Sequence, residues 1–445
     1  MSQVKKTSAY ILESLIISST RMLEPINIGP SVSDIEIFEH MDLAYLTGQV
    51  ALIDTFRLYD RLDFQGAEYC TIKMKQTENS PSVEKRFVID KLLTNKKANE
   101  QTDMIMFHII EDTVFSSNLK NVNKAYTGTP SDIITKLSSE WLNKKIINLV
   151  SDIFQKKMKV IIPNMTPMNA IRWIQKRGTT SRGYPTYLFS SFTTEDLVYA
   201  DLKTLMDRQA INKNSPFLYG PTQNDLEIQP FRCVPIKEYN IENVEDMYSI
   251  IDEGLVGAEY QFIDTHLSKQ KKYKFNVAND VFKDMSNELT GNKSVSYAID
   301  FDIDEVPLQD YLSRKITRIT ESGAYDDTSR RYHSYDEEVQ ASDHSKKIIA
   351  NALKSFLVKT PITIRVDGAG FIDNESHYTT GNIIRILFLA NRPTTDGKLK
   401  LDLKKSGDYL VYRAKHAFGH NRYYIHLTCV KLTHFTDDTP LKVIS

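Results

Sequence analysis

The sequence predicts an α+β protein in which strands concentrate toward the two ends of the chain and helices interrupt them. Apolar and polar residues alternate over strand-length runs in residues 47–110 and again in 381–432. Between these regions, two segments carry helix start signals followed by apolar residues at helical spacing. No internal repeat is visible in the sequence, although a structural repeat can persist without a sequence trace.

Composition is that of an ordinary soluble, multi-domain protein. The length of 445 residues suggests roughly three domains of about 150 residues, and the apolar content of 41% is enough for several cores. The 56 basic and 57 acidic residues give a net charge of -1, which argues against a dedicated nucleic-acid binder. Cys70, Cys233 and Cys429 lie far apart, so we expect neither a disulfide framework nor a zinc site.

The N-terminal segment has a superficial likeness to a secretion signal, because Lys5 and Lys6 precede the apolar run 11–17. Glu13 interrupts this run and no small-residue cleavage site follows, so we expect the segment to belong to the fold. No uninterrupted apolar stretch reaches about 18 residues, which predicts that no segment spans a membrane unaided. We therefore expect the chain to be made inside the cell.

The region up to about residue 120 is predicted to be β-rich. Its runs of strand length and composition are 47–53, 67–75, 87–93 and 104–110. Gly48 lies within the first run and Gly66 just before the second. A glycine at such a place marks a bulge, a turn or a close backbone approach, which suits a tightly curved sheet.

Helix signals begin at Thr129. This threonine can cap a helix, Pro130 suits the first helical position, and Asp132 can reach back toward the cap. The expected apolar face consists of Ile133, Ile134, Leu137, Trp141 and Leu142. A second helix is expected to open in the same way at Thr166 and Pro167, to bury Ala170, Ile171 and Ile174, and to stop near Gly178; a strand resumes at 187–189.

The pattern weakens after residue 200. Residues 231–239 and 257–264 have strand character, whereas 264–330 is rich in Lys, Asn and Asp and predicts a loop-heavy insertion. A long amphipathic helix is expected over 336–357, ending before Pro361. Its expected inward residues are Val339, Ile348, Ile349, Ala352, Leu353 and Phe356.

The end of the chain predicts three strands of one sheet, at 383–389, 409–415 and 423–430. In the last of them, Tyr423, Ile425, Leu427 and Cys429 share one face, and Tyr424, His426 and Thr428 share the other. Gly381 introduces the first strand, and the turn 405–407 opens the second at Gly407. At Gly407 we expect a strained or left-handed backbone.

The sequence has no signature of a common catalytic or metal site. It lacks a GxSxG elbow, a GxxxxGKS/T loop, an HExxH motif and paired CxxC motifs. Gly368 and Gly370 in DGAGFID lack the third glycine of a dinucleotide loop. We therefore expect no cofactor, no metal and no catalytic residue.

Two weaker metal patterns are better explained without a metal. Asp300, Asp302 and Asp304 have the first spacings of a calcium loop, but Glu305 and Tyr311 stand where that loop needs glycine and glutamate. His416 and His420 have i, i+4 spacing but flank Ala417-Phe418-Gly419 between two strands. A hairpin loop with polar tips is the better interpretation.

Close acidic pairs, Glu111 with Asp112 and Asp326 with Asp327, could in principle supply the two carboxylates of a glycosidase. Adjacent surface carboxylates are common, so neither pair predicts an activity. The basic runs at 144–145, 156–157 and 271–272 are interpreted as solvated faces.

The order of the last elements, with a polar loop, SGDYLV, a strand with a basic and histidine-containing tail, and a final aromatic strand, resembles the closing barrel of the baseplate hub proteins of contractile-tailed bacteriophages. The order NKAYTGTPSDII, IIPNMTPMNAIRWIQKRG and YPTYLF also resembles this family, in which a small mixed domain interrupts two barrel domains. The resemblance is strongest around residues 47–75, 121–190 and 345–432.

The resemblance implies two β-barrel-like hub domains, a mixed α/β insertion and a loop-rich peripheral domain. The expected divisions are a first barrel at 1–120, a mixed domain at 121–225, a second barrel at 226–265 with 346–432, a peripheral insertion with a helix start at 266–345, and a tail at 433–445.

The function that the resemblance implies is structural and not enzymatic. Family membership implies a homotrimeric ring in the tail baseplate of a virion, assembled in the host cytoplasm. The implied partners are the tail tube or a tube-initiator protein, the central spike protein, baseplate wedge proteins, and the phage DNA that passes through the bore. Two alternatives stay open: a hub-associated cell-wall hydrolase, and the hub of a bacterial contractile injection system.

Symmetry gives a more specific expectation. A tube of sixfold rings must meet a threefold hub, and two similar barrels per chain would supply six quasi-equivalent docking positions. We therefore expect the two barrel regions to share one strand order and to alternate around the ring as its inner wall. Edge-to-edge association would also remove unpaired strand edges.

Overall fold

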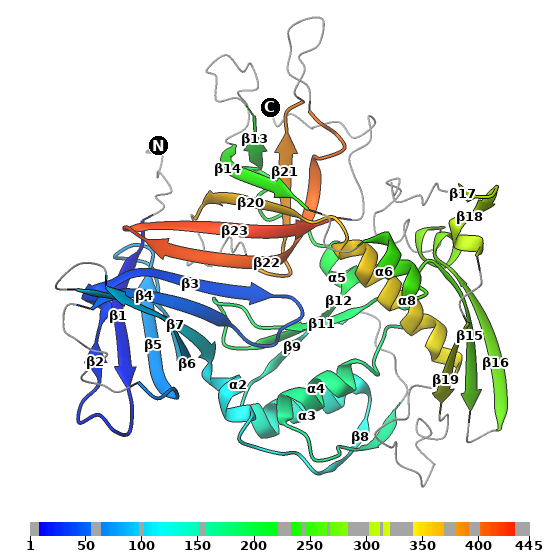
Figure 1. The fold of residues 1–445 in the computed structure, drawn as a ribbon, viewed down its shortest axis with the longest axis horizontal. Helices are drawn as coiled ribbons and strands as arrows, with labels where there is room; N and C mark the ends of the chain where they lie inside the picture. The colour runs from blue at the N-terminus through cyan, green and yellow to red at the C-terminus, as the bar shows by residue number, and fades with distance from the viewer. Residues whose placement is uncertain are drawn as a thin grey trace, which may run out of the picture.

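The computed structural model describes residues 9–54, 64–97, 102–150, 157–220, 233–242, 246–264, 268–283, 302–311, 315–320, 341–368, 379–390 and 401–431. These residues form a mostly β structure with few helices, dominated by one 13-stranded sheet. In Figure 1 the N-terminal strands lie at one end, the C-terminal strands lie above the centre, and the long helix α8 leads to a separate sheet at the other end. No described helix is long and apolar enough to cross a membrane.

The N-terminal part of the large sheet, here called the N-terminal sheet, has the order β2-β1-β5-β6-β7-β4-β3. The strands are β1 (Ile11–Ser18), β2 (Ile26–Asn27), β3 (Val32–His40), β4 (Thr47–Asp54), β5 (Glu68–Lys75), β6 (Val83–Lys97) and β7 (Asp103–Glu111). The four strands predicted in this region are confirmed as β4 to β7. Strands β1 and β3 were not predicted; their acids, such as Glu13 and Glu36, interrupt apolar runs because they occupy the outward face.

The C-terminal part closes on itself as a six-stranded barrel, in the order β22-β21-β13-β14-β20-β23 with β23 returning to β22. Its strands are β13 (Phe217–Tyr219), β14 (Val234–Ile241), β20 (Ile362–Asp367), β21 (Ile383–Phe388), β22 (Gly407–Gly419) and β23 (Arg422–Val430). The predicted faces of the last strand are confirmed: Tyr423, Ile425, Leu427 and Cys429 are buried, and the alternate residues are more exposed.

The N-terminal sheet and the closed barrel share one strand order. Six strands of each unit can be numbered in chain order, from β1 to β7 without the two-residue β2, and from β13 to β23 without the strands of the other sheets. Both units then have the order 2-3-6-5-4-1. In both units the four successive pairings 2–3, 3–6, 6–5 and 5–4 are antiparallel. Strand 1 differs, because β1 is antiparallel to β5 whereas β13 is parallel to β21.

The two units also share details of backbone conformation and hydrogen bonding. The N–H of Ala67 donates to the carbonyl of Ile89 at 2.8 Å, and the N–H of Gly381 donates to that of Val411 at 2.9 Å. Both donors precede strand 4 of their unit and have positive φ, +68° and +81°. Both acceptors precede a β-bulge in strand 5. The repeat that the sequence conceals is therefore visible in three dimensions.

Strand β3 joins the two units, because it pairs with β4 on one side and with β22 on the other. The register runs from His40 opposite Arg413 to Asp34 opposite Gly419. Side chains from both units form one continuous apolar core.

A mixed region follows β7, and α3 and α4 pack together within it (Figure 1). Its helices are α2 (Asp112–Ser117), α3 (Pro130–Leu137), the π-helix η2 (Ser138–Leu142), α4 (Pro167–Gln175) and α5 (Leu202–Met206). Its short strands are β8 (Ala125–Gly128), β9 (Ile146–Asn148), β10 (Met158–Ile161), β11 (Thr186–Phe189) and β12 (Leu197–Asp201). The capping box of Thr129 with Asp132 is confirmed. Thr166 precedes α4 as expected, but its side chain makes no capping hydrogen bond.

A third part packs on α8 (Ala341–Val358), which ends before Pro361 as predicted. It contains α6 (Met247–Asp252), β15 (Gly257–Asp264), β16 (Lys269–Asn276), the π-helix η3 (Ala278–Lys283) and β19 (Lys315–Thr320), with the small hairpin β17 (Asp302–Ile303) and β18 (Val306–Pro307) and the 3-10 helix η4 (Leu308–Asp310). Val339 of the expected helix lies outside the described residues.

Two strands lie in a sheet other than the one expected for them. Residues 257–264 do form a strand, but β15 pairs with β16 and β19 in a separate sheet and not with the barrel. The closed barrel instead includes β13, from the region expected to be mixed. The described part of 266–345 is also less loop-rich than expected. Strand β16 was not recognised in the sequence, because lysines on its outer face hide the alternation of Tyr273 and Phe275.

The four predicted glycine positions serve different ends. Gly66 and Gly381 adopt positive φ before β5 and β21. Gly407 opens β22 with φ +152°. Gly48 lies inside β4, where a Cβ would come within 2.6 Å of the Glu36 carbonyl, so only glycine allows this approach of β3 and β4.

Candidate functional site

A buried carboxylate, Glu39 at the end of β3, lies where the N-terminal sheet, the barrel and the mixed region meet. It accepts hydrogen bonds from the backbone N–H of Phe192 at 2.7 Å and of Thr380 at 3.0 Å. The hydroxyls of Ser191 and Thr380 also donate to it, at 3.3 and 3.2 Å. Its fifth contact is His416 Nε2, at 3.2 Å. One side chain thus ties together β3, the segment 190–196 between β11 and β12, the entry to β21, and β22.

Strand geometry explains why these polar side chains point inward. Glu39 follows Ile35 and Ile37 on the inner face of β3, and His416 lies between Ala414 and Phe418 on the inner face of β22. The second ring nitrogen of His416 lies 2.8 Å from the hydroxyl of Tyr423. Burial alone raises the pKa of Glu39, but His416 and the two backbone N–H groups outweigh it and lower this pKa below its ordinary value.

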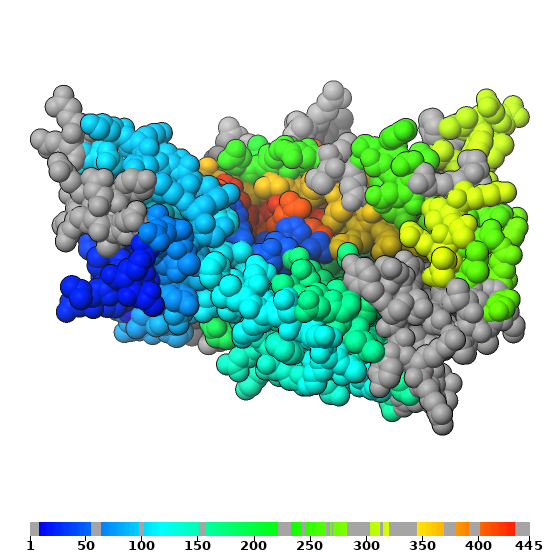
Figure 2. Space-filling view, turned by 60° about the horizontal axis from the view of Figure 1, so that its bottom comes forward, coloured from blue at the N-terminus to red at the C-terminus, as the bar shows by residue number. Residues whose placement is uncertain are grey.

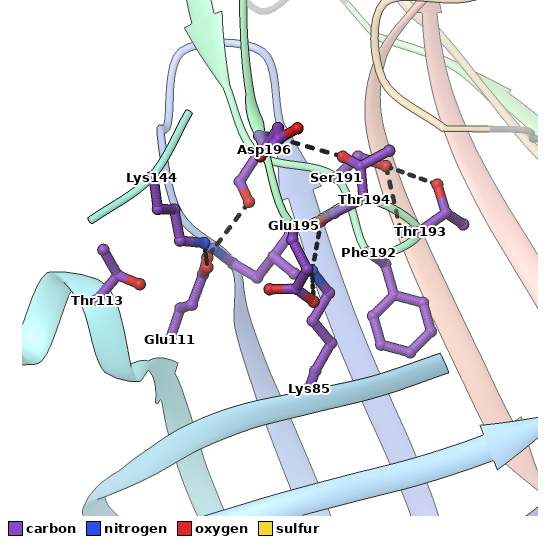
Figure 3. Close-up of polar contacts among 12 residues, drawn as sticks. Lys85, Glu111, Thr113, Lys144, Ser191, Phe192, Thr193, Thr194, Glu195 and Asp196 are labelled. Atoms are coloured by element: carbon purple, nitrogen blue, oxygen red, sulfur yellow. Dashed lines mark hydrogen bonds and ion pairs between the residues drawn. The ribbon is translucent and has the colours of Figure 1, made fainter. Parts of the chain in front are cut away.

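Two lysines, Lys144 and Lys85, form polar contacts around segment 190–196 (Figure 3). Lys144 forms an ion pair with Glu111, whose second oxygen accepts from the N–H of Leu46 at 2.9 Å and from the hydroxyl of Ser190 at 3.3 Å. Lys85 of β6 donates to the carbonyl of Thr194 and lies 2.9 Å from Glu195. Lys85 and Glu111 are only 4% and 3% exposed. Glu111 is paired inside the protein with Lys144, whereas the partner of Lys85, Glu195, has a side chain that is 73% exposed.

Two modest surface pockets lie nearby. One, of about 350 Å³, is bordered by Asp112, Lys144 and Glu195. The other, of about 300 Å³, lies between α8 and the barrel, and Figure 2 shows the hollow where segments coloured blue, gold and red meet. Asp42 in its wall is bonded by Lys354 and by the hydroxyl of Tyr412.

Electrostatics in this second pocket follow from burial. Burial and the neighbouring Arg413 lower the pKa of His40 to about 4, so its imidazole is neutral at pH 7. Burial raises the pKa of Asp42, but Lys354 more than offsets this effect and holds the pKa below its ordinary value. Burial raises the pKa of Tyr412 as well. These groups are a paired carboxylate, a neutral imidazole and a protonated phenol, and they stabilise the joint between α8 and β22.

The residues considered as sites from the sequence do not come together. His416 is buried within β22, whereas His420 lies in the two-residue turn between β22 and β23, so the expected hairpin loop is shorter than predicted. The turn residues His420 and Asn421 both have positive φ, the conformation of a tight type I′ hairpin. Asp304 and Glu305 form a similar turn between β17 and β18. Within the described part of the chain, no cluster of three metal-ligating side chains occurs.

Some of the other residues singled out in the sequence have a different environment from the one expected, and some lie outside the described residues. Glu111 is not a surface carboxylate and Lys144 is not on a solvated face, because the two are buried against each other. Gly368 packs directly against the ring of Tyr423, where a Cβ would come within 2.0 Å of the ring, so the position needs glycine for close packing. Asp300, Asp326, Asp327, Lys156 and Gly370 lie outside the described residues.

The buried joint around Glu39 was missed from the sequence. A signal was present, since Glu39 continues the inward alternation of Ile35 and Ile37, and an acid on that face must find partners. The sequence could not name those partners, because His416 and Thr380 come from the opposite end of the chain.

The arrangement has the chemistry of a rigid structural joint. Its carboxylates and lysines are satisfied by each other and by backbone groups, so the described joint offers no free nucleophile or acid–base pair beside a deep cleft. Such networks fix the relative position of the elements that supply their members.

Comparisons with known proteins place the fold. No protein-family model matches the sequence, and no curated protein matches it. Among solved structures, a tail protein from Neisseria meningitidis MC58 is 12% identical, with a TM-score of 0.52 over 95% of this chain and 96% of that one. The 43 kDa tail protein of prophage MuSo2 from Shewanella oneidensis is 10% identical, with a TM-score of 0.50 over 94% and 98%.

Both likenesses extend over nearly the whole of each chain, so they concern the complete architecture and not one domain. The resemblance to tail proteins that the sequence suggested is confirmed at the level of the fold: this chain has the fold of the phage tail proteins.

Proposed function

We propose that this chain is a structural baseplate hub subunit of a phage tail. The observation that carries the proposal is the full-length likeness to the Neisseria tail protein, which covers 95% of this chain and 96% of that one. The polar joint around Glu39 suits a structural role, because its charges hold elements together and leave no described reactive group beside a deep cleft.

The hub is a homotrimer whose ring lies between the tail tube and the central spike. The shared 2-3-6-5-4-1 strand order supports this geometry, since two similar units per chain give six similar docking positions in three chains. The ring docks a tube or tube-initiator protein on one side and the spike on the other, wedge proteins surround it, and phage DNA passes through its bore. Its place is the tail baseplate of the virion, after assembly in the host cytoplasm.

The domain division follows the same proposal. Residues 1–120, whose described strands form the open N-terminal sheet, are the first hub domain, and the closed barrel, made of the barrel strands of 226–265 and 346–432 joined by β13, is the second. Residues 121–225 are otherwise the mixed domain, 266–345 with β15 the peripheral insertion, and 433–445 a tail.

Mass and shape test this proposal. Sedimentation equilibrium of the purified chain should give three times the monomer mass of 51.1 kDa, and negative-stain images should show rings with a central hole. A compact monomer at all concentrations, with no ring formed after addition of tube or spike protein, would contradict it. Sheath, tube and spike genes without capsid genes beside this one would assign the same hub to a bacterial injection system.

A further inference from the structure

Among the strand edges that have no neighbouring strand within the described residues, two belong to β6 and β14. Beyond Ile89, β6 pairs with β7 alone, because its pairing with β5 ends there. Beyond Pro235, β14 pairs with β20 alone, because its pairing with β13 ends there. Each free edge is exposed and carries an exposed apolar side chain, Leu93 at 37% and Ile241 at 40%. Open edges of this kind are templates for pairing with another chain.

The shared strand order shows what covers the corresponding edges within one chain. Strand β6 is strand 5 of its unit and corresponds to β22; strand β14 is strand 2 and corresponds to β3. Strands β3 and β22 pair with each other over Asp34–His40 and Arg413–Gly419. The pair that joins the two units within a chain is therefore a strand 2 on a strand 5, and one strand of each kind is left open.

β-Bulges fix the correspondence residue by residue. Strands β3 and β14 have the same irregularity, between Val32 and Asp34 and between Ile236 and Glu238. Strands β22 and β6 also have equivalent β-bulges, between Val411 and Arg413 in β22 and between Ile89 and Lys91 in β6. Counted from these points, Glu36 corresponds to Asn240 through their strand 3 partners, and Ala417 corresponds to Lys96 through their strand 6 partners. A second bulge in β6, at Leu93, is included in this count.

We propose that the β14 edge of one copy pairs antiparallel with the β6 edge of the next copy, with Asn240 opposite Lys96 and Ile241 opposite Asn95. The inference rests on the proposed trimeric hub and names the surface that closes it. The two edges are different, so the contact is head-to-tail, and repetition around three chains closes a ring.

Burial at equivalent positions supports this pairing. Ile37, which β22 helps to cover, is 0% exposed, whereas its equivalent Ile241 on the open edge is 40% exposed. A strand laid beside β14 would shield Ile241 in the way that β22 shields Ile37. Leu93 on β6 would be shielded at the same contact.

Charge selects the partner. The open part of β6 carries Lys91, Lys96 and Lys97, whereas the open part of β14 carries Lys237 and Glu238 and is followed by Glu242. In the proposed register, Lys96 lies diagonally between Glu238 and Glu242 on one face, within the reach of cross-strand charge pairs. The internal contact has the same feature, since Lys415 of β22 lies 2.7 Å from Glu36 of β3. Pairing of β6 with a second β6 would oppose lysines to lysines.

Cysteine cross-linking of the full chain tests the register. Cross-strand Cα atoms lie about 4.5 or 5.5 Å apart, and both distances suit a disulfide. The test variant combines Lys96→Cys and Asn240→Cys in a Cys233→Ser background, because Cys70 and Cys429 are buried. Mild oxidation should convert its trimers into covalent trimers on a non-reducing gel. The matched control, Lys96→Cys with Ile241→Cys, places the two thiols on opposite faces and should cross-link far less.

Charge reversal gives an independent readout. Lys96→Glu with Lys97→Glu should reduce the trimer fraction measured by sedimentation, and Glu238→Lys with Glu242→Lys should restore it. Trimers that neither cross-link in register nor respond to these charges would overturn the β6–β14 contact and leave the hub proposal standing. A wild-type chain that stays monomeric, alone and with tube or spike protein, would overturn both. Equal cross-linking of the test and control pairs would show that the register is wrong.

Discussion

Glu39 and His416 contact each other at 3.2 Å, with both side chains at 0% exposure, across the pairing of β3 with β22. One residue belongs to the N-terminal sheet and the other to the closed barrel, so the contact lies on the boundary of two units with the same strand order. A buried carboxylate that is fully hydrogen-bonded contributes little net stability, but separating it from its partners is costly. The pair therefore specifies how the two units sit together.

Glu39→Ala should lower the free energy of unfolding by about 3–5 kcal/mol, because it leaves His416 and the N–H groups of Phe192 and Thr380 buried without their acceptor. Glu36→Ala on the same strand is the matched control. It removes a partly exposed pair with Lys415 and should cost about 0–1 kcal/mol. Urea denaturation of the two variants checks the difference, and equal losses would show that the buried network adds nothing to cohesion.

The same carboxylate predicts a pH dependence. The folded pKa of Glu39 is below its unfolded value of 4.5, so its contribution is complete above pH 4.5 and is lost as the pH falls through the folded pKa. Wild type should therefore lose stability on acidification below pH 4.5 more steeply than Glu39→Gln, which cannot titrate. Denaturant midpoints across this range measure the two slopes. Parallel curves would assign the acid sensitivity to other carboxylates.

Ala67 and Gly381 hold equivalent left-handed positions, and substitutions there should have opposite effects. Gly381→Ala should cost at least about 1–2 kcal/mol, since φ is +81° and a Cβ would come within 2.5 Å of Phe189. Ala67→Gly removes such strain and should be neutral or stabilising by up to about 1 kcal/mol. Thermal melts of both variants test the equivalence, which a destabilised Ala67→Gly would contradict.

Gly407→Val should lower thermal stability or trimer yield, with a cost of about 1–3 kcal/mol, because a β-branched residue is strained at a φ of +152°. Lys404→Val is a control in the same loop, where the side chain is exposed. Its effect should stay within about 0.5 kcal/mol. An unchanged melting temperature and unchanged assembly for Gly407→Val would mean that the turn tolerates a side chain.

The purified chain should not hydrolyse peptidoglycan. Of the two acidic pairs that could have suggested a glycosidase, Glu111 with Asp112 is engaged in the structure, since Glu111 is buried against Lys144, and Asp326 with Asp327 lies outside the described residues. Release of soluble fragments from purified cell walls is the measurement, with lysozyme as the positive control. Turnover that a single Asp or Glu substitution abolishes would favour the hydrolase alternative.

Local signals in the sequence were sufficient for most individual elements. The alternation of Tyr423 to Cys429 placed β23 and its inward face, and Thr129, Pro130 and Asp132 placed the start of α3. These features depend on residues a few positions apart, whose spacing the chain itself fixes. Among the strands that were missed, β1 and β3 carry acids on their outward faces, and the lysines of β16 hid a strand in the same way.

Partnership between distant elements was decided by the tertiary structure. Nothing local to residues 257–264 indicates that β15 joins β16 and β19 instead of the barrel. Likewise, the inward-facing position of Glu39 indicates that it needs polar partners, but only the pairing of β3 with β22 brings it to His416. The sequence by itself determined where strands and helices form and which faces they bury, because those properties follow from local periodicity. Strand order, its repetition in two units, and the edges left open depend on how the whole sheet closes, because hydrogen bonds between strands join residues whose separation along the chain carries no local signal.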